Sequence, residues 1–351
     1  MLVCLAASML LSTLFCPLII ALCKKFNWYD EVDPRKIHTG LIPRLGGVAL
    51  FAAFIISFGI YCAFFHPYDI SESWPLFAGG MLILLFGVID DFINMRAKIK
   101  FLVQIIAALL VVTSPCYFTH MFFIEIPPLI GRVFTFFWII GIVNAFNLID
   151  GMDWLCGGLS FFAVLTLGFI FMLDGNDIFA MHFILCGAIF GFLVWNKPNA
   201  KIFLGDGGSQ SLGYIIAASP LFYPDRGHFN FNLILVMILL CSIPITDVIA
   251  AILRRKREGR SFFSPDRGHI HHKLLNIGFT KSTAIFFLLM LQFLLCVIVL
   301  TTYFMDPFAG GILLIVAIAF VFIIFIVFHY LNRSVNMRHA GHLSEAPQKE
   351  H

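Results

Sequence analysis

The sequence has few charged residues for its length. Asp, Glu, Lys and Arg make up 12% of its 351 residues, whereas 60% are hydrophobic and 42 are phenylalanine. A water-soluble domain carries about 25% charged residues. The shortage of charge therefore excludes an ordinary soluble domain and indicates a polytopic membrane protein.

Features of several other protein classes are also missing. The nine cysteines lie singly, without CxxC spacing, so we predict neither a disulfide nor a zinc site. The sequence contains no internal repeat or low-complexity segment, and nothing in it suggests a nucleic-acid partner. The first apolar stretch lacks a small-residue cleavage site and is followed by more apolar stretches, so we expect a retained helix rather than a signal peptide.

Long apolar stretches are abundant. A helix needs about 17 to 25 residues to cross a bilayer, and on that basis we predict an all-α bundle of eleven transmembrane helices. They form a single domain over residues 1–331, followed by a polar tail, 332–351, that we expect to be disordered. The predicted helices are residues 2–23, 46–66, 74–89, 101–118, 129–146, 158–173, 178–195, 209–223, 231–253, 283–304 and 309–331.

The basic residues predict the orientation of this bundle. Lys and Arg collect in cytoplasmic loops, and of the 23 in the chain only Arg132 and Arg226 fall on the other side. We therefore expect the N-terminus outside and the C-terminus inside, with a multi-pass chain in the inner (plasma) membrane and an active site on its cytoplasmic face. The candidate active-site loops are residues 24–45, 90–100, 147–157, 196–208 and 254–282.

Five acidic residues at the cytoplasmic ends of the predicted helices are the clearest sign of function. Asp90 and Asp91 end the third helix, Asp150 and Asp153 follow the fifth, and Asp206 follows the seventh. A charge in the bilayer core costs about 2.5 to 3.5 kcal/mol on insertion scales. Carboxylates gathered on one face also repel one another unless a cation neutralises them. The pattern favours a site for a divalent cation and a phosphate.

Three of the loops carry further polar groups. In NAFNLIDGMDWLCGGLS, residues 144–160, the pairs Asn144/Asn147 and Asp150/Asp153 have the three-residue spacing that places side chains on one helical face, where each pair could converge on one ligand. In residues 201–213, glycines around Asp206 favour an anion near a helix N-terminus, or else only a tight connection.

The last cytoplasmic loop contains SPDRGHIHHKL, residues 264–274. His269 and His272 are three residues apart, and Arg267 suits a bidentate phosphate contact. Three histidines also suit zinc, but no cysteine lies nearby. A phosphorylated, sugar-bearing substrate is the better interpretation. Asp247, inside a predicted helix, is interpreted as packing or loop support.

Five ordered motifs together resemble the polyprenyl-phosphate N-acetylhexosamine-1-phosphate transferases of glycosyltransferase family 4, close to the bacterial enzymes that use N-acetylglucosamine. The resemblance spans nearly the whole chain. The motifs are RKIHTGLIPRLGG (35–47), DDFIN (90–94), NAFNLIDGMD (144–153), FLGDGGS (203–209) and SPDRGHIHH (264–272).

The resemblance implies transfer of a sugar 1-phosphate from a UDP-sugar to a lipid phosphate, with release of UMP and a requirement for Mg²⁺, for which Mn²⁺ is an alternative. Carried over residue by residue, it implies that Asn147 and Asp206 bind the metal and that Asp90, Asp91, Asp150 and His272 are catalytic. It implies that Lys100 binds the lipid phosphate, that Asp153 and Asn196 bind the uracil end of the nucleotide, and that Phe203 lines the base pocket. The pyrophosphate and sugar would contact Arg267, His269 and His271, with His272 beside them.

UDP-N-acetylglucosamine and undecaprenyl phosphate are the substrates predicted first, because Ile270 interrupts the histidine run that is continuous in the related peptidoglycan enzyme. Another UDP-N-acetylhexosamine and UDP-MurNAc-pentapeptide are alternatives, and so is a multi-pass transporter. A homodimer is left open. Two residues depart from the family pattern: Asn94 stands where a third Asp is usual, and Trp154 where Gly is usual.

Overall fold

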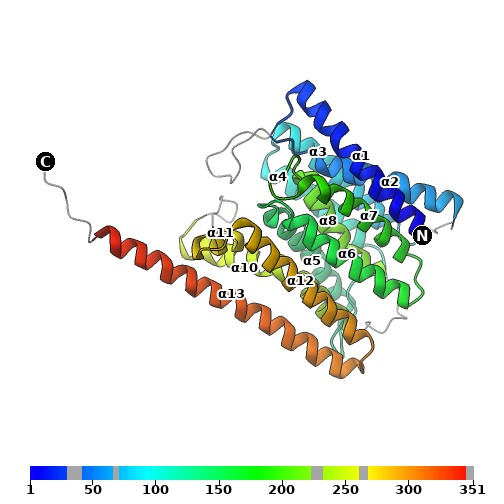
Figure 1. Ribbon diagram of the computed structural model, residues 1–351. Coiled ribbons are helices and arrows are strands. Elements are labelled where there is room, and N and C mark those ends of the chain that lie inside the picture. Colours follow the sequence, from blue (N-terminus) through cyan, green and yellow to red (C-terminus); the bar gives the residue numbers. More distant parts are fainter. Residues whose placement is uncertain (30–41, 66–70, 223–231, 261–267, 345–351) are drawn as a thin grey trace.

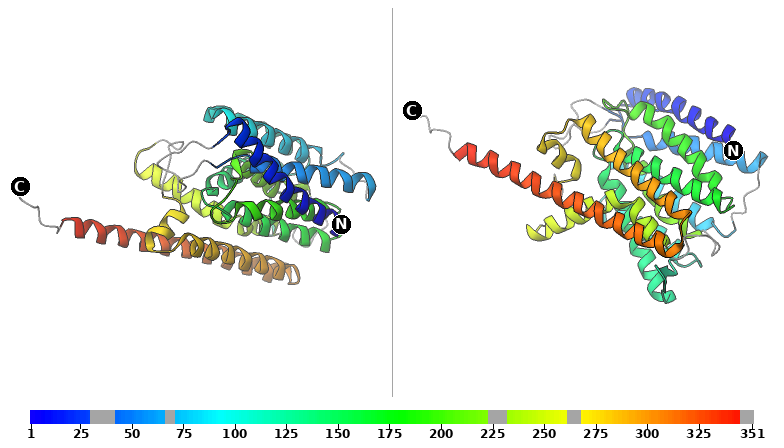
Figure 2. Two further views of the ribbon diagram at one scale, coloured as in Figure 1. Left: turned by 45° about the horizontal axis from the view of Figure 1, so that its top comes forward. Right: turned by 60° about the horizontal axis from the view of Figure 1, so that its bottom comes forward.

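The computed structural model describes residues 1–29, 42–65, 71–222, 232–260 and 268–344, the last seven of them by their backbone only. Most helices lie side by side in one bundle (Figures 1 and 2). The elements are α1 (Leu2–Phe26), α2 (Gly46–Phe64), α3 (Trp74–Ile93), α4 (Ala97–Val112), β1 (His120–Met121), β2 (Ile124–Glu125), α5 (Pro128–Ile149), α6 (Leu155–Leu173), α7 (Phe179–Asn196), α8 (Gly205–Ala218), the 3-10 helix η1 (Ser219–Phe222), α9 (Leu233–Leu240), α10 (Ser242–Arg257), α11 (Ile270–Ile277), α12 (Lys281–Tyr303) and α13 (Pro307–Ser344).

The prediction of an all-α membrane bundle is confirmed. Within the described ranges, eight helices are long and apolar enough to span a membrane, and the bent pair α9 and α10 makes up to nine. The helices α4 and α8 have only 16 and 14 residues and fall short of that length. The count of eleven and the orientation therefore stay predictions. The two short strands form one antiparallel hairpin between α4 and α5.

The single helix predicted over residues 231–253 is wrong. Two helices, α9 and α10, lie there instead, and they meet at an angle of 74°. The cause is Pro244, near the start of α10, because proline has no N–H for the carbonyl four residues earlier and its ring clashes with it. That carbonyl belongs to Leu240, the last residue of α9, and it accepts a hydrogen bond from Gln292 Nε2 at 2.9 Å instead.

A second proline, Pro17, lies inside α1 without breaking it. The carbonyl that it leaves without an N–H donor belongs to Thr13, and Trp195 Nε1 on α7 donates to this oxygen at 2.9 Å. Close packing supports the exchange, since a Cβ added to Gly187 or Gly191 of α7 would lie 2.3 Å from a carbonyl oxygen of α1. Small residues four apart are typical of tightly packed membrane helices.

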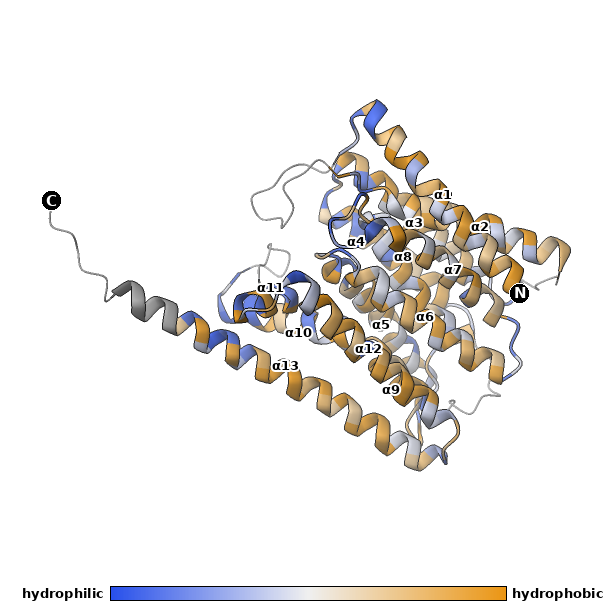
Figure 3. Ribbon diagram, viewed as in Figure 1, coloured by the Kyte–Doolittle hydropathy of each residue, from blue (hydrophilic) through white to orange (hydrophobic). Residues whose placement is uncertain are grey.

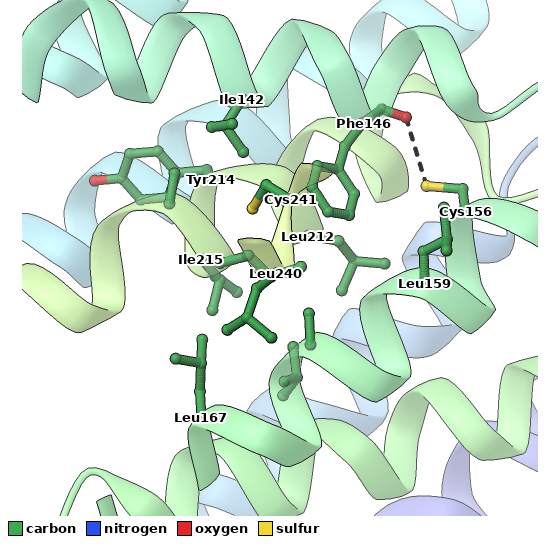
Figure 4. Close-up of a cluster of buried hydrophobic side chains, with 14 of the residues drawn as sticks. Ile142, Phe146, Cys156, Leu159, Leu167, Leu212, Tyr214, Ile215, Leu240 and Cys241 are labelled. Carbon is green, nitrogen blue, oxygen red and sulfur yellow. Dashed lines mark hydrogen bonds between the residues drawn. The ribbon is translucent and has the colours of Figure 1, made fainter. Parts of the chain in front are cut away.

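The short helix α8 lies at the centre of the bundle. Every residue of α8 except Asp206 is buried, and α8 packs against α2, α3, α5 and α6. Glycines permit this approach: a Cβ on Gly87 of α3 would lie 2.5 Å from Gly207 Cα, and one on Gly47 of α2 would lie 2.5 Å from Gly208 Cα. Further along α8, Leu212 and Tyr214 join a buried apolar cluster with side chains of α5, α6 and α9 (Figure 4).

The expectation of a disordered tail from residue 332 is wrong for its first part. The last helix, α13, continues as far as Ser344 and extends past the other helices (Figures 1 and 2). Its extension is tied to α11, because Asn276 Nδ2 donates to Asn332 Oδ1 at 2.8 Å and to Asn336 Oδ1 at 2.9 Å. This part of the tail therefore supports the last predicted loop.

The helix crossing between α3 and α8 gives a test of the packing. Gly87→Ala should destabilise the protein, by about 1 to 3 kcal/mol as in other overpacked cores, because the new Cβ would lie 2.5 Å from the backbone of Gly207. Gly141→Ala is the matched control, since no atom lies within 4 Å of its Cβ position and alanine favours the helix by up to about 1 kcal/mol. Thermal unfolding in detergent measures both, and equal midpoints would contradict the proposed close contact.

Candidate active site

The start of α8 is held by a carboxylate from α3. Asp91 Oδ1 accepts the N–H of Asp206 at 2.8 Å, and its Oδ2 accepts the N–H of Gly207 at 3.1 Å. The residue before α8, Leu204, offers no side-chain cap, so Asp91 supplies the cap from another helix. Gly205 has φ +77°, and a Cβ there would lie 2.0 Å from the carbonyl oxygen of Arg44, which only glycine avoids.

Three of the predicted aspartates gather at this point. Asp90, which is 3% exposed, forms an ion pair with Lys100 and accepts the N–H of Met95 at 2.6 Å. The same Lys100 ammonium lies 3.1 Å from Asp206 Oδ2. Arg44 Nη2 lies 3.7 Å from Asp206 Oδ1. Carboxylates from two helix ends thus meet, and two cations offset their repulsion.

The two asparagines of α5 have different hydrogen-bond partners within the chain. Asn147 Nδ2 donates to Ser209 Oγ at 3.2 Å, which places it beside the first turn of α8. Asn144 Nδ2 instead donates to Gln104 Oε1 at 2.7 Å, and Gln104 Nε2 donates to Gln210 Oε1 at 3.0 Å. This chain of three amides ties α4, α5 and α8 together one turn deeper than Lys100, Asn147 and Asp206.

Oxygen atoms suited to a hard cation are present at this cluster. The amide of Asn147 donates through its nitrogen, which leaves Oδ1 outside that hydrogen bond, and Asp206 brings a carboxylate to the same turn. Within the described residues, no group of three or more His, Cys, Asp or Glu side chains is arranged to enclose a metal ion. Such a donor set fits Mg²⁺, which is usually bound by one or two protein oxygens together with substrate phosphates.

A cavity of about 380 Å³ opens beside the aspartate cluster. Arg44 and Gly205 belong to both, so the cavity and the cluster form one site. Its walls come from the α5–α6 turn, the α7–α8 connection, α11 and the start of α12. The lining residues are Arg44, Leu148, Asp150, Gly151, Met152, Asp153, Asn196, Pro198, Asn199, Phe203, Gly205, His269, His271, His272, Lys281, Ser282 and Ile285.

Asp150 and Asp153 both line the cavity, although they do not share a helical face. The helix α5 ends at Ile149 and α6 begins at Leu155, so both acids lie in a turn. Burial and the negative charge of Asp206 raise the pKa of Asp150 to about 8, so its carboxyl group holds a proton near neutral pH. Asp153 Oδ2 accepts the N–H groups of Asn199 and Ala200, at 3.2 and 3.3 Å.

Asn196 has a structural task in the cavity wall. Its Oδ1 accepts the N–H of Trp154 at 2.8 Å, and its Nδ2 donates to the carbonyl of Ile202 at 2.8 Å. Both the oxygen and the nitrogen of this amide already form hydrogen bonds within the chain. The predicted contact of Asn196 with a nucleotide stays a prediction. Phe203, predicted for the base pocket, does line the cavity.

The two departures from the family pattern both occur at left-handed backbone positions. Trp154 has φ +67°, which explains why glycine suits that place. Its indole Nε1 donates to the carbonyl of Leu193 at 2.7 Å, so it packs against α7 and does not line the cavity. Asn94 has φ 48° and ends α3, and asparagine adopts this conformation more readily than most residues.

The three histidines all line the cavity from the start of α11. His269 precedes the helix, and its ring is stacked on that of His271, with centroids 5.8 Å apart. Burial, with His272 next to it, lowers the pKa of His271 to about 3, so this imidazole stays neutral. Gly151 is in contact with His271, because a Cβ there would lie 2.7 Å from the ring. The α5–α6 turn and α11 therefore fix each other's position.

Some predicted site residues fall outside the described residues, and the sequence missed others. Arg267 and most of the first motif, residues 35–41, lie outside. Arg44 lies in the first motif and in the predicted loop 24–45 but was given no role of its own, yet it is an ion-pair partner of Asp206 and lines the cavity. Lys281 and Ser282, at the start of α12, were not predicted either, because nothing in their spacing suggests a ligand.

Comparisons with known proteins agree with this site. A model of glycosyl transferase family 4 matches residues 73–223, the stretch from α3 to α8 that contains Asp90, Asp91 and Asp206. A probable undecaprenyl-phosphate N-acetylglucosaminyl 1-phosphate transferase of Bacillus subtilis is 31% identical over 299 residues, covering 82% of this chain and 80% of the relative. The chain belongs to glycosyl transferase family 4. It is therefore a multi-pass phospho-sugar transferase.

Two further relatives support the same family. The undecaprenyl-phosphate alpha-N-acetylglucosaminyl 1-phosphate transferase of Escherichia coli (strain K12) is 31% identical over 287 residues, which are 78% of this chain and 76% of the relative. That of Thermotoga maritima is 30% identical over 299 residues, 80% of this chain and 90% of the relative. The family 4 resemblance stated from the five motifs is confirmed.

The raised pKa of Asp150 predicts a pH dependence of stability. The folded state keeps a proton on Asp150 up to about pH 8, whereas the unfolded chain releases it near its model value of 3.8. The free energy of unfolding should therefore fall as pH rises from 4 to 8, by at most about 1.4 kcal/mol per pH unit from this group. Asp150→Asn should remove this part of the slope.

Thermal midpoints in detergent with a metal chelator, measured from pH 5 to 8, test the prediction. The midpoint of the unmodified protein should drop more steeply than that of Asp150→Asn. Parallel curves would show that Asp150 is already ionised in the folded protein.

Proposed function

We propose that this family 4 transferase moves N-acetylglucosamine 1-phosphate from UDP-N-acetylglucosamine to undecaprenyl phosphate, forming the lipid diphosphate sugar and releasing UMP. The observation that supports it best is that an aspartate cluster at one end of the bundle adjoins a cavity of the size that binds small ligands. The relatives from three bacteria carry names for this activity.

Charge neutralisation is the main catalytic task, because phosphoryl transfer needs little covalent work from the protein. Asp206 and Asn147 would hold Mg²⁺ through their oxygens. Bound there, Mg²⁺ would offset the charge of the pyrophosphate and of the departing UMP. Arg44 and Lys100 lie against Asp206 and bring positive charge to the same place.

The attacking group in this proposal is the phosphate of the lipid. A phosphate monoester has its second pKa near about 6, so it is mostly a dianion at neutral pH and needs little help from a base. Asp91 is engaged in holding α8, whereas Asp90 lies with Lys100. We assign Lys100 to the incoming phosphate and Asp90 to orienting Lys100. A double displacement through an aspartyl phosphate is the alternative.

The nucleotide sugar would occupy the cavity between Asp153 and the three histidines. Neutral His271 and protonated Asp150 offer hydrogen bonds there without adding charge, while Arg44 and Lys281 bring positive charge to the same cavity. The loops that form the site would face the cytoplasm, with the chain in the inner membrane, as the distribution of basic residues predicts. Another UDP-N-acetylhexosamine is the alternative donor.

A direct assay tests the reaction. Purified protein with labelled UDP-N-acetylglucosamine, undecaprenyl phosphate and Mg²⁺ should give a labelled lipid and UMP, and a chelator should stop the reaction. UDP-N-acetylgalactosamine and UDP-MurNAc-pentapeptide, tested in parallel, identify the preferred donor. If no donor yields labelled lipid with Mg²⁺ or Mn²⁺, the proposal is wrong.

A pair of variants tests where the reaction takes place. Asp206→Ala should abolish turnover, because it removes the proposed metal ligand and leaves Lys100 and Arg44 without this partner. Asp174→Ala is the control: it follows α6 at the opposite end, about 28 Å along the helix from the Asp153 turn. Its activity should stay close to that of the unmodified protein, and an equal loss from both variants would contradict a site at one end.

A further inference from the structure

One buried acid, Asp247, is not explained by the site described so far. It lies on α10, beyond the bend at Pro244, and is 1% exposed. Its Oδ2 lies 2.8 Å from His269 Nδ1, and its Oδ1 accepts the N–H of Ile270 at 2.7 Å. A buried carboxylate is costly unless it is hydrogen-bonded. Both oxygens of Asp247 have partners at the start of α11.

The contact with Ile270 caps α11 from outside. Ile270 is the first residue of this helix, and the preceding residue, His269, makes no side-chain cap. The carboxylate of Asp247 accepts an N–H that the helix itself cannot use. Asp247 thus fixes the point at which α11 begins, and with it the place of His269 in the cavity wall.

The contact with His269 fixes where the ring carries its proton. An ionised carboxylate only accepts hydrogen bonds, so Nδ1 of His269 must be the donor. In the neutral ring, Nε2 is then an acceptor. The His271 ring is stacked on that of His269, and the His272 ring lies against His271. Arg254 lies against Gly268, where a Cβ would be 2.2 Å from the guanidinium carbon.

An acceptor at Nε2 selects the kind of group that it contacts. Ionised phosphate oxygens are themselves acceptors and would be repelled, whereas a hydroxyl or an amide N–H donates. His269 lines the same cavity as Asp153 and Phe203, the walls of the proposed nucleotide-sugar site. The ring therefore suits the sugar or nucleoside part of the substrate better than its pyrophosphate.

We propose that Asp247 is a positioning residue that holds His269 as the Nδ1–H tautomer, so that Nε2 accepts a hydrogen bond from a hydroxyl or amide group of the bound nucleotide sugar. The identity of the ligand rests on the proposed function. The tautomer and its cause do not, because they follow from contacts within the chain.

Nitrogen NMR of the protein labelled with ¹⁵N-histidine tests the tautomer without any substrate. The signals of His269, assigned by their loss in His269→Asn, should show Nδ1 protonated and Nε2 unprotonated at pH 7.5. In Asp247→Asn, whose amide nitrogen faces the ring or rotates away, this pattern should be lost. A ring protonated at Nε2 alone, or at both nitrogens, in the unmodified protein would overturn the proposal even if no transferase activity is found.

Kinetics test whether Asp247 acts through His269. Asp247→Asn keeps an oxygen for the N–H of Ile270, so its thermal midpoint should change little, while kcat/KM for the nucleotide sugar falls about 10- to 100-fold, as when other residues that orient a functional histidine are lost. The double variant with His269→Asn should be no slower than His269→Asn alone. Additive losses would overturn the proposal.

The matched control is Asp174→Asn. Asp174 also accepts a side-chain hydrogen bond, from the hydroxyl of Tyr303 at 2.6 Å, but at the other end of the bundle. It should retain the kinetic constants of the unmodified protein. If Asp247→Asn does not fold, the NMR measurement on the unmodified protein still decides the tautomer.

Discussion

The hydrogen bonds from the start of α8 to Asp91 are the constraint on which the site depends. They join the end of α3 to a helix that is buried on all sides, and they fix the first turn of α8, where Asp206 lies. Gly205, with its positive φ, leaves no space between this turn and the backbone of Arg44. Once α8 is placed, Asp206 must lie against Lys100 and Arg44, and the cavity wall at Gly205 follows.

The aspartates could be predicted from the sequence because acidic residues grouped at the ends of apolar helices are seldom explained by packing or solvation alone. Topology alone brings Asp90, Asp91 and Asp206 to one end of the bundle. Their division of labour could not be predicted, because it depends on which carboxylate faces a backbone N–H and which faces a lysine. Asn144 illustrates the limit: its spacing from Asn147 is helical, but its partner is Gln104 on another helix.

Local conformation accounts for the other differences between prediction and structure. The sequence shows Pro17 and Pro244 but not which of them breaks its helix. In both cases a side chain of a neighbouring helix donates to the carbonyl that the proline frees, yet α1 continues past Pro17 whereas α9 and α10 meet at 74°. Trp154 and Asn94 both depart from the family pattern. The structure explains them as residues at left-handed positions, which no spacing rule reveals.

The apolar cluster around α8 affects the passage of charge through the bundle. Side chains such as Phe146, Leu212 and Tyr214 form a buried apolar cluster around α8 (Figure 4). The most hydrophilic stretches of the ribbon lie toward the end that holds the site (Figure 3). An apolar layer of this kind resists the passage of ions and protons. A cell can therefore hold many copies of this protein in its membrane without dissipating its membrane potential.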